Sequence, residues 1–102
     1  MEINNGEKYY LPVLATEFIA TSLFVLSWNL NVDGGVMVPI VLFCLIMLTG
    51  NISGGHMNPG VTLAVYIERE KYRDNFCYLV VIICAQTLGA FAAVGLGFML
   101  RV

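Results

Sequence analysis

Charged side chains are scarce in this sequence of 102 residues, with only five lysines and arginines and seven aspartates and glutamates. Soluble globular domains are about a quarter charged, so a charged share of 12% excludes an ordinary soluble domain. Hydrophobic residues make up 59% of the chain and gather in three long stretches, which is typical of an integral membrane protein. The net charge of -2 offers no basic surface, so we expect no nucleic-acid partner.

Cysteine and histidine are also scarce. Three cysteines without paired spacing do not form a disulfide framework, and we expect them to be small core hydrophobes: Cys44, Cys77 and Cys84. The single histidine, His56, has no cysteine or carboxylate nearby, so we expect a structural hydrogen-bonding role and no metal site. No group of residues resembles a catalytic site, and we expect neither an enzyme nor a cofactor.

The three apolar stretches, residues 11–28, 36–52 and 76–100, are each long enough to cross a bilayer. The N-terminus lacks a basic segment and a cleavage site, so the first stretch is predicted to be a retained helix of a multi-pass protein. Four of the five basic residues fall on one side of a three-span arrangement. The positive-inside rule then places the N-terminus and residues 68–74 in the cytosol.

Between the second and third stretches, residues 54–60 are polar and helix-breaking, yet they lead back into apolar sequence. Asn58 can cap a new helix with its side-chain oxygen and Pro59 suits the first helical position, which predicts a short helix over residues 59–67. With Glu68 at the surface, Asn58 lies roughly 15 Å deeper, near the middle of a hydrocarbon core about 30 Å thick. Irregular backbone at that depth indicates a pore or a transport site.

Two polar side chains inside the outer stretches are candidates to support this loop. Glu17 lies within the first stretch, where a carboxylate costs roughly 2.5 to 3.5 kcal/mol, so it should face protein. Its expected partners are the unpaired backbone N–H groups of the loop, and partial snorkelling to the cytosolic surface is the alternative. Gln86, in the third stretch, can serve the same loop with a donor and an acceptor.

Small residues recur at every fourth position of the third stretch and therefore share one helical face: Ala85, Gly89, Ala93 and Gly97. Such a face lets two helix backbones approach closely in a membrane. The pattern fits either packing within one subunit or an interface between subunits.

Residues 53–63, which read SGGHMNPGVTL, resemble the first signature loop of the aquaporins, the major intrinsic proteins. Residues 16–18 (TEF) and 85–90 (AQTLGA) are similar to that family's marks on its first and third helices. The resemblance covers nearly the whole chain but only the first half of the family's pattern. It implies an all-α membrane protein in which residues 1–102 form one half-repeat, with three transmembrane helices and one re-entrant half-helix.

The resemblance also implies roles for individual residues. Two inverted halves of such a fold each point the positive N-terminal end of a half-helix at the midplane. There Asn58, followed by Pro59 and Gly60, would donate to a passing solute. Val38 falls where the family has an aromatic constriction residue, and a valine would widen the filter. Four backbone carbonyls would form an acceptor ladder: Gly54, Gly55, His56 and Met57.

We therefore expect a half-length or fragmentary aquaporin-like channel for passive passage of water or small neutral solutes such as glycerol. Its partners would be the lipid bilayer, the solute and, in a homo- or hetero-oligomer, full-length relatives. The alternative is a non-conducting membrane subunit that associates with such relatives through the small-residue face. Gly60 replaces the alanine of the family's usual triplet, and the second triplet is absent. One half cannot enclose a pore by itself.

Overall fold

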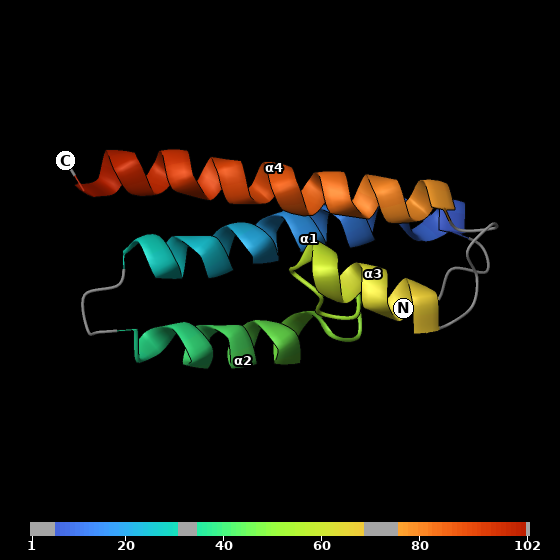
Figure 1. Cartoon of the computed structure of the whole chain (residues 1–102), viewed down its shortest axis with the longest axis horizontal. Coiled ribbons are helices and arrows are strands. Elements are labelled where there is room, and N and C mark those ends of the chain that lie inside the picture. Colours follow the sequence, from blue (N-terminus) through green and yellow to red (C-terminus); the bar gives the residue numbers. More distant parts are fainter. Residues whose placement is uncertain (1–5, 31–34, 69–75, 102) are drawn as a thin grey trace.

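The computed structural model describes residues 6–30, 35–68 and 76–101, and within these ranges the regular structure is entirely helical. The helices in chain order are α1 (Gly6–Asn29), α2 (Met37–Thr49), α3 (Pro59–Glu68) and α4 (Phe76–Arg101). α1 and α4 lie side by side along the long axis of the molecule (Figure 1). α2 contacts α1, α3 contacts α4, and the two short helices follow one another along this pair.

α1 and α4 run parallel in close contact. Ser22 Oγ on α1 donates to the carbonyl oxygen of Gly89 on α4 at 3.0 Å. Farther along both helices, Asn29 Nδ2 donates to the carbonyl oxygen of Ala93 at 3.3 Å. Because residue numbers rise together along the contact, both helices begin at the same end of the molecule (Figure 1). The segment from α2 to α3 therefore brings the chain back to that end.

The small-residue face of α4 packs against α1. A Cβ added to Gly89 would lie 2.5 Å from the carbonyl oxygen of Phe18, and one added to Gly97 would lie 2.9 Å from Asn29 Cβ. Ala93 between them is buried, and Ala85 one turn before Gly89 is half-buried. Of the two interpretations left open by the sequence, the structure shows packing within one subunit. The other interpretation, an interface between subunits through this face, is wrong because α1 already occupies the face.

The second apolar stretch forms a shorter helix than the expected span over residues 36–52. α2 contains 13 residues, or about 20 Å at about 1.5 Å per residue, against a hydrocarbon core of about 30 Å. The helix begins after Gly35, whose φ of 91° lies in the left-handed region that favours glycine. Pro39 then occupies the first turn, where its missing N–H group is not needed.

α2 ends at Thr49 because its ladder of hydrogen bonds becomes irregular there. The carbonyl oxygen of Thr49 accepts from the N–H groups of both Ile52 and Ser53, each at 2.9 Å. One further turn follows, in which Gly54 N donates to Gly50 O at 3.2 Å. The backbone after α2 thus continues as turns as far as Gly54.

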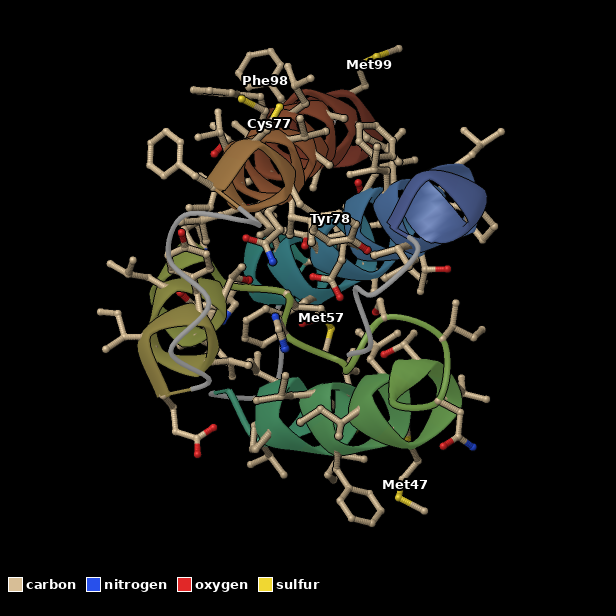
Figure 2. All side chains as sticks on the ribbon, turned by 90° about the vertical axis from the view of Figure 1, so that its right-hand side faces the viewer. Met47, Met57, Cys77, Tyr78, Phe98 and Met99 are labelled. Carbon is tan, nitrogen blue, oxygen red and sulfur yellow. The ribbon has the colours of Figure 1, made fainter. Side chains whose placement is uncertain are left out.

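The outer surface of the bundle is apolar, as a lipid-facing surface must be. Within α1 and α4, the segments Leu11–Asn29 and Phe76–Leu100 are long and apolar enough to cross a membrane. In the most hydrophobic part of each segment only 22% and 28% of the residues are buried in the bundle, whereas a core helix of a soluble protein is mostly buried. Figure 2 shows Met47, Phe98 and Met99 pointing away from the bundle. The described helices thus include two, rather than three, of spanning length.

The cysteines do not belong to the core. Cys44, Cys77 and Cys84 are free and exposed, so the expectation that they are small core hydrophobes is wrong. Their helices are apolar on every side, and hydropathy therefore does not reveal which face is buried.

Gly89→Ala is expected to destabilise the bundle by about 1–3 kcal/mol, because the added methyl must push the backbone of α1 away. Gly95→Ala is the matched control on the same helix. A Cβ at Gly95 meets nothing within 4 Å, so this change should stabilise α4 by about 0.5–1 kcal/mol. Thermal unfolding in detergent, followed by circular dichroism, measures both. Equal effects of the two substitutions would contradict the close contact of α1 with α4.

Candidate functional site

The loop between α2 and α3 enters the middle of the bundle and leaves it as a new helix. Gly54, Gly55 and Met57 have φ angles of 92°, 67° and 54°, all in the left-handed region. Glycine adopts this conformation readily, whereas Met57 needs its surroundings to hold it there. Met57 is buried against residues of α1 and α2 and points inward (Figure 2). The loop is therefore packed inside the bundle and is not a surface connection.

Asn58 caps α3. Its side-chain Oδ1 accepts from the N–H group of Gly60 at 2.7 Å, and its carbonyl oxygen accepts from Thr62 N at 3.0 Å. Pro59 is the first residue of the helix, as a residue without an N–H group should be. The observed helix extends the expected range of residues 59–67 by one residue, to Glu68.

The carboxylate of Glu17 is the point at which the loop is held. Oε2 accepts from Ser53 Oγ at 2.5 Å and from His56 N at 3.3 Å, while Oε1 accepts from Met57 N at 2.8 Å. Oε1 also accepts from Gln86 Nε2 of α4 at 2.7 Å. Glu17 is completely buried. The side chain therefore does not snorkel to the surface, and four donors surround its two oxygens.

Gln86 extends this network to α3. Its Nε2 group donates both to Glu17 and to Thr62 Oγ1, the latter at 2.8 Å. Thr62 Oγ1 lies 3.0 Å from His56 Nδ1. Sequence reasoning missed Thr62 as a site residue. It carries the one side-chain hydroxyl in an otherwise apolar first turn, and it lies four residues after the cap. That spacing places it on the same helical face as Asn58.

These contacts orient the backbone of the loop. Its N–H groups at His56 and Met57 turn toward Glu17. Within the part of the chain that the structure describes, the carbonyls of Gly54, Gly55 and Met57 accept no hydrogen bond. Asn58 Oδ1 makes the cap, and the Nδ2 group of the same side chain has no partner among the described residues. These polar groups can therefore bind a small molecule that donates and accepts hydrogen bonds.

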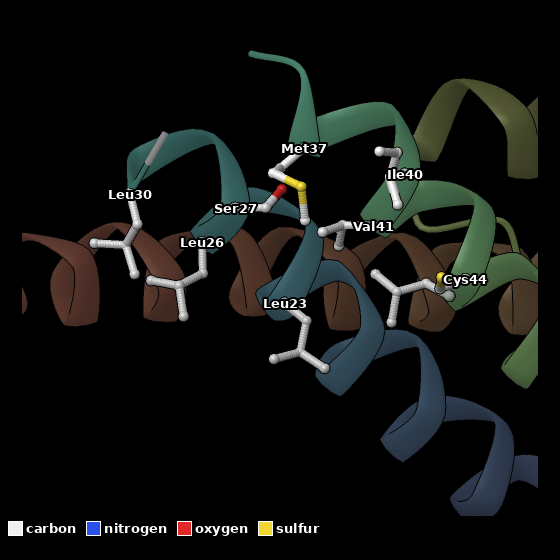
Figure 3. A pocket seen from close by; sticks show the side chains of 9 residues that line it. Leu23, Leu26, Ser27, Leu30, Met37, Ile40, Val41 and Cys44 are labelled. Carbon is white, nitrogen blue, oxygen red and sulfur yellow. The ribbon is translucent and has the colours of Figure 1, made fainter. Parts of the chain in front are cut away.

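The remaining candidates lie away from this loop. Val38 is buried in the first turn of α2, toward the opposite end of the molecule from α3 (Figure 1). An open groove of about 400 Å³ lies along the contact between α1 and α2, and its wall is almost entirely apolar (Figure 3). A surface that makes no hydrogen bonds cannot orient a polar solute, so the loop is the better candidate. The groove is lined by Leu23, Leu26, Ser27, Leu30, Met37, Ile40, Val41, Cys44 and Leu45.

Comparison with known proteins identifies the family. Residues 7–101 match the model of the family described as "Major intrinsic protein". The chain belongs to this family. Its members are membrane channels, not enzymes, and they form oligomers. The resemblance inferred from the loop and the two helix motifs is thereby confirmed.

The curated relatives of this major intrinsic protein include proteins of Toxoplasma gondii and of two plants. An aquaglyceroporin of Toxoplasma gondii is 29% identical over 101 residues, which cover 92% of this chain and 37% of the relative. Aquaporin PIP2-1 of Arabidopsis thaliana is 32% identical over 86% of this chain, and the probable aquaporin PIP2-1 of Oryza sativa is 34% identical over 85%. The chain spans 37% of the length of each of the three. No solved structure gives a significant match.

Glu17→Leu should destabilise the protein by ~3 kcal/mol or more, since it leaves four donors without an acceptor and each buried unpaired group costs ~1–3 kcal/mol. Glu17→Gln should be milder, because its amide oxygen still accepts from backbone N–H groups. Thermal unfolding in detergent compares the two with wild type. If the leucine variant melts at the wild-type temperature, Glu17 does not support the loop.

Proposed function

We propose that this chain forms one half of a channel through which water or small neutral solutes such as glycerol pass passively. The observation that carries the proposal is the orientation of the loop, whose N–H groups at His56 and Met57 donate to Glu17, while three of its carbonyls and the Asn58 Nδ2 group have no partner among the described residues. Solutes that lose water on entering a narrow passage need such replacement partners. The names of two relatives, an aquaglyceroporin and an aquaporin, support this class of solute.

In the proposed arrangement the chain crosses the membrane three times. α1 and α4 are two of the spans, and α2 with the turns after it forms the third. The parallel course of α1 and α4 supports this arrangement, since one intervening crossing must return the chain to the same side. The cytosolic orientation of the N-terminus rests on basic residues that lie outside the described ranges: Lys71, Arg69 and Arg73, with Lys8 at the start of α1. Three crossings from a cytosolic N-terminus would place Val102 outside, and this residue also lies beyond the described ranges.

The loop would select neutral solutes through the half-helix. The N-terminal end of α3 carries partial positive charge, which opposes cations and protons near Asn58. Val38 replaces an aromatic residue and Gly60 replaces an alanine. Both side chains are smaller than the ones they replace, so each leaves more open space in the proposed pathway. These two substitutions favour a passage wide enough for solutes larger than water.

One loop with one half-helix supplies one side of such a passage. A narrow pore needs walls all round and an opposing half-helix to complete the pair of midplane donors. The complementary surface would come from a second half of the aquaporin pattern or from full-length relatives in an oligomer. The small-residue face of α4 cannot bind such a partner, because α1 covers it. The alternative function, a non-conducting subunit, required this face to bind full-length relatives, so it lacks an interface.

We expect the 102-residue chain alone to leave the water permeability of liposomes unchanged. Co-reconstitution with a complementary second half should restore flux, and Asn58→Asp should then reduce it. The aspartate keeps the oxygen that caps α3, so the fold should persist, but it loses the amide donor and adds a costly charge near the midplane. Stopped-flow light scattering measures the permeability.

Circular dichroism of Asn58→Asp provides the control, since unchanged helicity separates a lost donor from a lost fold. Rapid vesicle shrinkage with this chain alone that disappears in Asn58→Asp would overturn the half-channel proposal. It would indicate instead that two inverted copies form the passage.

A further inference from the structure

Thr62 connects three elements through one hydroxyl oxygen. It lies in the first turn of α3, and its Oγ1 atom contacts Gln86 Nε2 of α4 at 2.8 Å and His56 Nδ1 of the loop at 3.0 Å. Thr62, Gln86 and His56 are all buried. The directions of these hydrogen bonds follow from which groups can donate.

The first direction is set by Glu17. A carboxylate oxygen accepts hydrogen bonds, and Gln86 Nε2 lies 2.7 Å from Glu17 Oε1. The reverse orientation of the amide would place its carbonyl oxygen against the carboxylate oxygen. Glu17 therefore fixes the amide of Gln86 with its NH2 group toward both Glu17 and Thr62.

The second direction is set by Gln86. An amide nitrogen only donates, so Thr62 Oγ1 accepts from Gln86 Nε2. A threonine hydroxyl also has one hydrogen to donate. Among the described residues, the only other partner of Thr62 Oγ1 is His56 Nδ1. The hydroxyl hydrogen therefore points to that nitrogen.

We infer that Thr62 is a positioning residue that holds His56 as the neutral tautomer with its hydrogen on Nε2. Nδ1 accepts from Thr62 and so carries no hydrogen of its own, which leaves Nε2 as the N–H donor of the ring. Glu17 thus orients the amide of Gln86, Gln86 orients the hydroxyl of Thr62, and that hydroxyl selects the tautomer of His56. The inference concerns the loop on which the proposed function rests, but it holds whether or not the loop conducts.

Nuclear magnetic resonance of the full chain, with 15N-labelled histidine, tests the inference without ambiguity because His56 is the only histidine. The measurement is made in lipid bilayers, above the ordinary titration range of histidine. We expect an unprotonated Nδ1 and a protonated Nε2 in wild type and in Thr62→Ser, which keeps the hydroxyl. Thr62→Val removes the donor with little change in shape, and a signal from protonated Nδ1 should then appear.

Thr87→Val is the matched control, because Thr87 Oγ1 donates to Ile83 O within its own helix at 2.8 Å. Its histidine spectrum should equal that of wild type. A protonated Nδ1 in the wild-type chain would overturn the inference even if Thr62→Val does not fold. An unchanged spectrum in a folded Thr62→Val variant would overturn it as well.

Flux measurements keep this inference separate from the proposed function. If the histidine spectra are as expected but the complemented protein passes neither water nor glycerol, the proposed function is wrong and the tautomer assignment stands. If Thr62→Val lowers flux while its histidine spectrum stays that of wild type, Thr62 acts on the passage without His56 and the inference is wrong.

Discussion

A single buried carboxylate allows irregular backbone to exist inside this bundle. Backbone N–H groups that leave a helix must find acceptors, and in a membrane water cannot provide them. Glu17 accepts from two such groups, His56 N and Met57 N, and from the Ser53 hydroxyl at the start of the loop. The left-handed conformation of Met57 is held by the same contact and by packing of its side chain. Removing the acceptor would therefore affect conformation, packing and hydrogen bonding together.

The position of Glu17 depends in turn on how closely α1 and α4 approach. Gly89 lets the backbone of α1 lie where a methyl group would otherwise be, and Ser22 and Asn29 cross-link the helices at successive levels. At this separation Gln86 reaches the Glu17 carboxylate directly. Small residues on one face of α4 thus contribute to the loop by letting α1 and α4 lie close together. Packing and the candidate site are consequences of the same helix pair.

Much of this arrangement could be predicted from sequence where one residue type has few alternatives. An asparagine before a proline predicts a cap and a helix start, and a lone carboxylate in an apolar stretch predicts a partner within the protein. Those contacts are present for Asn58 and Glu17. The family, too, followed from short motifs, because their order and spacing are specific.

Other features depend on tertiary contacts that hydropathy does not encode. The end of α2 at Thr49 follows from hydrogen bonds made by the turns after it, and the exposed cysteines lie on helices that are apolar all round. The role of Thr62 required knowledge of which donors surround one oxygen. None of these three features is visible in residue spacing alone.

Hydrogen exchange at the backbone amides of His56 and Met57 tests most directly whether Glu17 holds the loop. These groups lie outside the described helices, and each donates its hydrogen bond to the carboxylate. In the reconstituted wild-type chain we expect both amides to exchange slowly. In Glu17→Leu they should exchange rapidly while amides in the middle of α4 stay protected. Slow exchange of both loop amides in a folded Glu17→Leu variant would contradict the dependence of the loop on this carboxylate.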